Sequence, residues 1–119
     1  FWNENVLDKE LENPLSEYIA AIENDEVVGY AGLWQPIDEG HITNIVTKKE
    51  KRGNHIGAKM LEVIIKLAKR KNLKCVTLEV NEHNEPAISL YKKYNFVEVG
   101  KRTKYYNNTD DAIIMTLEI

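Results

Sequence analysis

The sequence predicts an α/β fold, a single domain in which helices pack on a mixed β-sheet. A strand pattern over 41–47, a helical pattern over 57–71 and a strand pattern over 74–80 follow one another. Such a strand–helix–strand unit makes its two strands parallel, with a right-handed crossover. Hairpin patterns on either side of this unit add antiparallel strands. At 119 residues the chain is long enough for one domain and too short for two, so one domain is expected over 1–119.

The N-terminal half is expected to form one helix and three strands. An apolar stripe that follows an asparagine cap predicts a helix over 4–12. Two β-rich segments, 18–23 and 27–34, flank Asn24-Asp25 and predict a hairpin. A loop rich in turn residues then leads into the next strand.

The C-terminal half is expected to form two helices and three strands. Apolar residues recur every three or four positions over 57–71, with lysines on the other side, which predicts an amphipathic helix. A shorter helix is expected over 84–94, where Pro86 falls in the first turn. The three strands are expected over 74–80, 96–103 and 111–118.

Composition favours a cytoplasmic globular protein. The net charge is −3, whereas a nucleic-acid-binding protein usually has a basic excess, so no nucleic-acid partner is expected. One cysteine cannot form a disulfide within the chain, which fits a reducing compartment. No segment approaches the roughly 18 consecutive apolar residues of a membrane span. The three histidines and the cysteine lack metal-ligand spacing, so no metal is expected.

The stretch RGNHIGAKML, residues 52–61, places a glycine-containing turn directly before a helix. A P-loop would require Lys-Ser or Lys-Thr after its second glycine, and a Rossmann turn would require a third glycine. Neither is present. Free N–H groups at the helix start would still attract an anion. The simpler interpretation is that Gly53 and Gly57 only permit a tight turn and close packing.

The same turn resembles the pyrophosphate motif of the GCN5-related N-acetyltransferases (GNAT). In that motif an Arg or Gln is followed three positions later by Gly and five positions later by Gly or Ala. Arg52 and Gly57 match, and His55 stands at the first glycine position. The stretches 41–46, 77–80 and 84–96 are also similar to this family. With Lys104-Tyr105-Tyr106 and 111–115, the chain resembles its bacterial RimI subfamily.

This resemblance implies a mixed sheet of about six to seven strands with flanking helices. It also implies that an N-terminal strand and most of a helix are missing from this chain. The acetyl donor would be acetyl-CoA. The acceptor would be the N-terminal α-amine of a protein, most closely a small-subunit ribosomal protein that begins with alanine. Neutralising an α-amine at pH 7 costs about 1 kcal/mol, against about 4.6 kcal/mol for a lysine, so a modest base would suffice.

The resemblance also assigns roles to individual residues. Glu79 would be the general base, and Tyr91 the general acid that protonates the leaving thiolate. Tyr105 and Tyr106 would border the acceptor peptide. The strand ending at Thr47 would pair its backbone with the pantetheine arm, and the turn would hold the pyrophosphate on its amides. The implied donor-binding residues are Ile45, Val46, Thr47, Arg52, Gly53, Asn54, His55, Ile56, Gly57, Ala58 and Asn84.

Each assignment has a plainer alternative. Glu79 can be a solvated or sheet-bonded glutamate, Tyr91 a core residue, Asn84 a helix cap, and the tyrosine pair edge packing. For the whole chain, the alternatives are acetylation of a small amine or a protein lysine, a non-catalytic acyl-CoA-binding module, and an unrelated nucleotide-binding domain. The sequence also allows an acidic rim on the acceptor groove, formed by Asp38, Glu39, Asp110 and Asp111.

Overall fold

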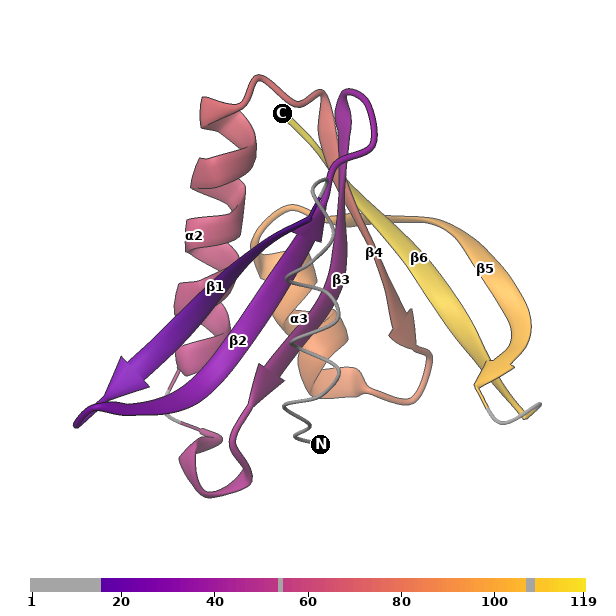
Figure 1. The fold of residues 1–119 in the computed structure, drawn as a ribbon. Helices are drawn as coiled ribbons and strands as arrows, with labels where there is room; N and C mark the ends of the chain where they lie inside the picture. Colours follow the sequence, from indigo (N-terminus) through magenta and orange to yellow (C-terminus); the bar gives the residue numbers. More distant parts are fainter. Residues whose placement is uncertain (1–15, 54, 107–108) are drawn as a thin grey trace.

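The computed structural model describes residues 16–53, 55–106 and 109–119, with Tyr105 and Tyr106 described only by their backbone. Six strands form one sheet in the order β1-β2-β3-β4-β6-β5 (Figure 1). The expected helix over 4–12 lies outside the described residues. The described elements are β1 (Ser16–Glu23), β2 (Glu26–Trp34), β3 (Glu39–Thr47), the 3-10 helix η1 (Lys49–Lys51), α2 (Ile56–Arg70), β4 (Cys75–Asn81), α3 (Glu85–Lys93), β5 (Val97–Tyr106) and β6 (Asp110–Glu118).

The mixed sheet predicted from the sequence is confirmed. β3 and β4 are parallel, and the neighbouring pairs β1–β2, β2–β3, β4–β6 and β5–β6 are antiparallel. Both expected hairpins are present. The helices over 57–71 and 84–94 agree with α2 and α3 to within one residue at each end. No helix in the described part of the chain combines the length and the apolar character needed to cross a bilayer.

Both helices cover the same face of the sheet, behind the strands in the view of Figure 1. The buried side of α2 consists of Met60, Leu61, Ile64 and Ala68, at the spacing of one helical face. Partly buried apolar residues of α3 pack against the same core. The Tyr94 hydroxyl also donates to Glu62 Oε2 at 2.5 Å, which ties α3 to α2.

β3 and β4 are paired only where they begin. Their register runs from Glu39 opposite Cys75 to His41 opposite Thr77. Beyond these residues the two strands diverge, toward the bottom of Figure 1. β3 stays paired with β2 as far as Thr47, and β4 stays paired with β6 as far as Asn81. The facing edges of β3 and β4 are therefore open in the middle of the sheet.

β4 sends alternate side chains to the two faces of the sheet. Val76, Leu78 and Val80 are buried in the core under the helices. Thr77 and Glu79 consequently point to the opposite face, next to the opening between β3 and β4. The fold thus places a glutamate on the helix-free face at the point where the sheet divides.

Candidate active site

A cavity of about 520 Å³ lies on the helix face, where β3 ends and both helices begin. Three chain segments meet around it: the end of β3, the turn into α2, and the start of α3. Every expected donor-binding residue lines it except Asn54, which lies outside the described residues. The lining residues are Ile45, Val46, Thr47, Lys51, Arg52, Gly53, His55, Ile56, Gly57, Ala58, Asn84, Pro86, Ala87 and Leu90.

The start of α2 presents free backbone donors to this cavity. The first intrahelical hydrogen bond runs from the Lys59 N–H to the His55 carbonyl at 3.1 Å. The amides of Ile56, Gly57 and Ala58 precede it, and none of them has an acceptor within the described part of the helix. Among the described residues, no side chain caps this end of the helix, and its first turn carries no acid. The positive end of the helix dipole and the free amide N–H groups together favour the binding of an anion here.

The two glycines of the turn serve different purposes. Gly53 has φ +88°, a conformation that side chains rarely adopt, so the backbone itself calls for glycine there. At Gly57, a Cβ would meet only the Thr47 Oγ1, at 4.0 Å, among the described atoms. Packing among the described residues therefore does not explain Gly57. Close approach of a ligand to this backbone would explain it, because Gly57 lines the cavity.

Asn84 caps α3 and also lines the cavity. Its side-chain Oδ1 accepts the Ala87 N–H at 3.3 Å, so the helix-cap interpretation is confirmed. Its position in the cavity wall keeps a donor contact geometrically available. The two roles are compatible, because a cap uses one lone pair of the amide oxygen and leaves the amide N–H groups for other partners.

Glu79 belongs to a second cavity, of about 580 Å³, on the opposite face of the sheet. Its Oε1 forms an ion pair with Arg102 Nε at 3.1 Å. Its Oε2 is enclosed and has no hydrogen-bond partner among the described residues. A carboxylate oxygen without a partner keeps its lone pairs available to a ligand or a water molecule. The lining residues are Trp34, His41, Ile42, Thr43, Thr77, Leu78, Glu79, Arg102 and Ile114.

Tyr91 lies on the inner side of α3, half-buried against the core. Its ring contacts Phe96, with the ring centroids 5.9 Å apart, so the packing role is confirmed. The nearby Tyr94 is a poorer proton donor. Its hydroxyl is already bonded to Glu62, and this hydrogen bond raises the pKa of Tyr94.

The chain matches known proteins along most of its length. The sequence profile of the acetyltransferase (GNAT) family matches residues 1–96. The chain belongs to this family. A Bacillus subtilis relative is 38% identical over 110 residues, which cover 92% of this chain and 73% of the relative. Its name assigns it, provisionally, as a [ribosomal protein bS18]-alanine N-acetyltransferase.

Solved structures of GNAT proteins share the fold. The ribosomal-protein-S18-alanine N-acetyltransferase from Escherichia coli superposes with a TM-score of 0.90 at 26% identity, over 99% of this chain and 77% of that protein. A GNAT family acetyltransferase from Elizabethkingia anophelis, solved with acetyl-CoA bound, superposes with a TM-score of 0.84 at 23% identity, over 98% and 84% of the two chains. The chain is thus an acetyltransferase with the expected GNAT fold.

The two cavities of this GNAT chain meet the sheet at the same opening. The helix-face cavity uses Ile45, Val46 and Thr47 of β3, beyond the last residue paired with β4. The opposite cavity uses Leu78 and Glu79 of β4, also beyond that pairing. A donor on one face and an acceptor on the other could therefore react through the gap between the strands.

The expected acidic rim is wrong. Asp38 and Glu39 stand at the start of β3, beside the start of β4. Asp110 and Asp111 stand at the start of β6, which is antiparallel to β4 and so lies beside its other end. The four acids therefore occupy opposite ends of the sheet. The carboxylate of Asp38 is also engaged locally, in an ion pair with Lys74 at 3.0 Å.

Sequence reasoning missed Arg102, the partner of Glu79. β5 contains register irregularities between Glu98 and Gly100 and between Arg102 and Tyr106. An irregularity changes which side chains face which side of a sheet, so alternation along β5 could not be read from the sequence. The side chains of Tyr105 and Tyr106 lie outside the description, and their role remains a prediction.

His55 adopts a left-handed backbone conformation, with φ 61° and ψ 19°. This explains why glycine is common at the corresponding motif position. Histidine is among the side chains that enter this region more often than most, and here its side chain is exposed. The Cβ is therefore tolerated, and the residue still presents its backbone amide at the helix start.

Replacing His55 tests whether only its backbone matters. We expect His55→Gly to bind acetyl-CoA as the parent chain does, because the amide remains. We expect His55→Val to unfold more easily than His55→Gly by about 1–2 kcal/mol, because a β-branched residue is strained at this φ. Denaturant unfolding and calorimetric titration measure both effects. Loss of turnover in His55→Gly without loss of binding would instead show that the imidazole takes part in the reaction.

Proposed function

We propose that this chain transfers the acetyl group of acetyl-CoA to the N-terminal α-amine of a protein. The proposed acceptor is a ribosomal protein with an N-terminal alanine, as in the names of the Bacillus subtilis and Escherichia coli relatives. The observation that carries the proposal is the position of Glu79. We call the helix-face cavity the donor cavity. Glu79 lies on the opposite face, at the opening in the sheet, and one of its carboxylate oxygens lacks a partner among the described residues.

On the donor side, the backbone supplies most of the recognition. The pantetheine arm contains amides, which can hydrogen-bond to the open edge of β3 at Ile45–Thr47 much as an added peptide strand does. The pyrophosphate would lie on the amides at the start of α2. Arg52 lines the same cavity, with its Nε 3.4 Å from the Thr47 carbonyl, so a cation stands beside the proposed anion.

On the acceptor side, charge favours an α-amine. Glu79 and Arg102 neutralise one another formally, so this cavity offers no net negative charge from its acidic and guanidinium groups. A permanently cationic lysine or polyamine would gain little attraction there. An α-amine, with its pKa near 7.7–8.0, is partly neutral at pH 7 and needs only a weak base. Glu79 Oε2 would accept the amine proton, directly or through one water.

The leaving thiolate needs a proton on the donor side. Tyr91 is proposed as its source, because it lies on α3, the helix whose first turn lines the donor cavity. Packing against Phe96 fixes the ring and so sets the position of its hydroxyl. A phenol has a pKa near 10, whereas the thiol that leaves has a pKa near 8.5. Complete proton transfer to a free thiolate is therefore unfavourable, and Tyr91 would donate its proton while the carbon–sulfur bond breaks, as general acids do.

A panel of acceptors tests the proposed function. The chain would be incubated with acetyl-CoA and with peptides that carry a free N-terminal alanine, N-blocked peptides that contain lysine, or polyamines. We expect thiol release to be at least about tenfold faster with the free N-terminus than with the other amines. Faster release with lysine peptides or polyamines would favour those acceptors instead. Tight acetyl-CoA binding without release from any acceptor would indicate a non-catalytic binding module.

A further inference from the structure

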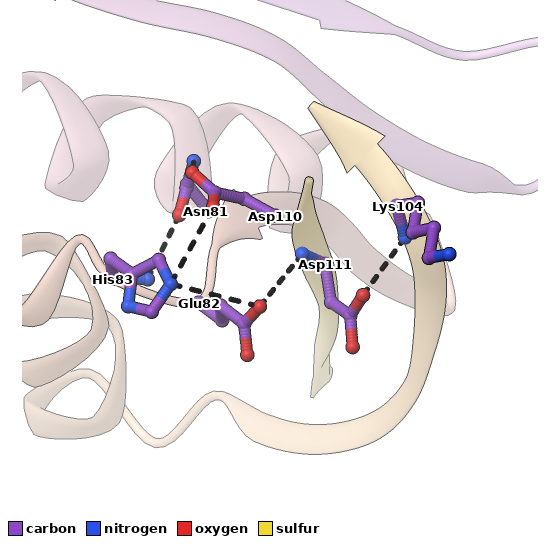
Figure 2. A network of polar contacts seen from close by, with 6 residues as sticks. All are labelled: Asn81, Glu82, His83, Lys104, Asp110 and Asp111. Carbon is purple, nitrogen blue, oxygen red and sulfur yellow. Dashed lines mark hydrogen bonds and ion pairs between the residues drawn. The ribbon is translucent and has the colours of Figure 1, made fainter. Parts of the chain in front are cut away.

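Polar contacts fasten the β5–β6 hairpin to the loop between β4 and α3 (Figure 2). We call Asn81, Glu82, Asp110 and Asp111 the hairpin bracket. The first two residues end β4 and begin the loop, and the other two begin β6. The bracket therefore joins segments that are far apart in the sequence. Two of its hydrogen bonds, from Asn81 to Asp110 and from Asp111 to Glu82, are partly buried, which strengthens them relative to exposed ones.

Asp111 holds a distorted residue of β5. Lys104 has φ +52°, a left-handed conformation that is uncommon for lysine, and it lies within a register irregularity of the strand. Its N–H therefore leaves the regular ladder. Asp111 Oδ1 accepts that N–H at 2.8 Å, as the right side of Figure 2 shows. The carboxylate thus stabilises the bulge that comes directly before Tyr105.

Glu82 holds Asp111 in turn. The Asp111 N–H donates to Glu82 Oε2 at 2.8 Å, and the Glu82 N–H donates to the Asp111 carbonyl at 3.0 Å. These two bonds extend the β4–β6 ladder by a side-chain contact beyond the end of β4. The loop and the start of β6 are consequently fixed to one another by a reciprocal pair, and through Asp111 to the bulge at Lys104.

The rest of the bracket reinforces this connection. Asn81 Nδ2 donates to Asp110 Oδ2 at 3.1 Å, and Asn81 Oδ1 accepts the His83 N–H at 2.9 Å. His83 Nε2 lies 3.6 Å from Asp110 Oδ1 and 3.8 Å from Glu82 Oε2. These three residues could also approach a cation, but Glu82 Oε2 already accepts a backbone N–H.

The bracket connects the two sides of the proposed reaction. Its loop continues into Asn84, whose N–H donates to the Asn81 carbonyl at 2.9 Å and whose side chain lines the donor cavity. Its hairpin continues from Lys104 into Tyr105 and Tyr106, the predicted acceptor border. We propose that Asp111 and Glu82 are positioning residues, which fix the acceptor-side hairpin relative to the donor cavity. This inference rests on the proposed function.

Position matters because amine and thioester must meet in a narrow geometry. A displacement of about 1 Å at the reacting atoms can cost about a hundredfold in rate. Loss of the Asp111 carboxylate would free the bulge at Lys104 and let the following strand end move. The donor cavity would keep its β3 edge and its helix amides. The expected signature is therefore impaired use of the acceptor with unimpaired binding of acetyl-CoA.

The kinetics of Asp111→Ala and Asp111→Asn test the positioning role of Asp111. We expect Asp111→Ala to lower kcat/KM for an alanine-terminated peptide by roughly tenfold to a hundredfold, while the Kd for acetyl-CoA stays within about twofold. Asp111→Asn keeps an oxygen acceptor for the Lys104 N–H, so we expect it to stay within about threefold of the parent chain. A kcat/KM in Asp111→Ala equal to that of the parent would overturn the proposal, as would an equal loss of acetyl-CoA affinity.

Glu82→Ala supplies a second, independent variant and protects the test against misfolding of the first. It should impair the peptide step in the same direction, and the double variant should lose less than the sum of the two, because both residues act through one chain of bonds. Strict additivity would contradict a shared role. Glu17→Ala is the matched control. It removes one carboxylate that pairs with Lys71, away from the hairpin, and should leave peptide kinetics unchanged.

The same experiment separates the inference from the proposed function. If the parent chain prefers another acceptor, the proposed function fails, and the variants are then compared on that acceptor. If the parent chain acetylates the peptide and neither Asp111→Ala nor Glu82→Ala alters its use, the positioning role alone fails.

Discussion

Replacing Glu79 with Gln should lower turnover by at least about tenfold, with the affinity for acetyl-CoA unchanged. Gln has nearly the same shape, and its Oε1 can still accept from Arg102 Nε. What it lacks is a basic oxygen to receive the amine proton. The donor cavity lies on the other face of the sheet, so binding should not respond. Steady-state thiol release measures turnover, and calorimetry measures the Kd.

Two further variants exclude other causes for that loss. Glu98→Gln makes the same change of charge on the exposed part of β5 and should leave turnover as it is. The double variant Glu79→Gln with Arg102→Gln removes the unbalanced guanidinium as well. If turnover returned in the double variant, the single loss would reflect the stranded positive charge, and Glu79 would not be the base. Near-normal turnover in the single variant Glu79→Gln would show that Glu79 is not the general base.

Replacing Tyr91 with Phe should lower turnover by about a hundredfold, the lower end of what a general acid contributes. The substitution keeps the ring and its contact with Phe96, so thermal stability should change little. In Tyr91→Phe the thiolate leaves without a proton from the enzyme, so turnover should depend more strongly on pH than it does in the parent chain. Rates measured with acetyl-CoA and with an acetyl donor that has a more acidic leaving thiol separate this step. The better leaving group should recover part of the loss.

Tyr94→Phe is the matched control for this second prediction. Tyr94 is the C-cap residue of the same helix, but its hydroxyl bonds to Glu62 and joins the end of α3 to α2. Its loss should lower stability and leave the chemical step intact. An unchanged rate in Tyr91→Phe, or the same rate loss in both variants, would leave Tyr91 with a packing role only.

Local patterns predicted the elements of this fold well, and for clear reasons. The apolar spacing over 57–71 specified α2, because packing on one face fixes a helix to the core. The strand–helix–strand order specified the parallel pair of β3 and β4. The family resemblance implied that the strand ending at Thr47 pairs with the pantetheine arm, which requires an open edge there. Nothing in a single strand sequence indicates where its partner strand turns away.

The features that sequence missed depend on long-range register and on backbone torsions. Arg102 meets Glu79 only because irregularities in β5 alter its alternation. The left-handed conformation of Lys104 leaves no mark in composition. The acidic rim was misjudged because the direction of β6 places its first residues beside the end of β4, away from Asp38. In each case the deciding fact is which segments become neighbours.

Because β3 and β4 diverge, the backbone groups on their facing edges have to be hydrated until a ligand binds between the strands. Backbone donors and acceptors cannot remain unpaired without a large free-energy cost, so water has to satisfy the facing edges of the two strands. Recognition there is an exchange in which an amide-bearing chain replaces ordered solvent and completes the sheet. The affinity of this acetyltransferase for its donor should therefore depend on how that water is held, as much as on any side chain that lines the gap.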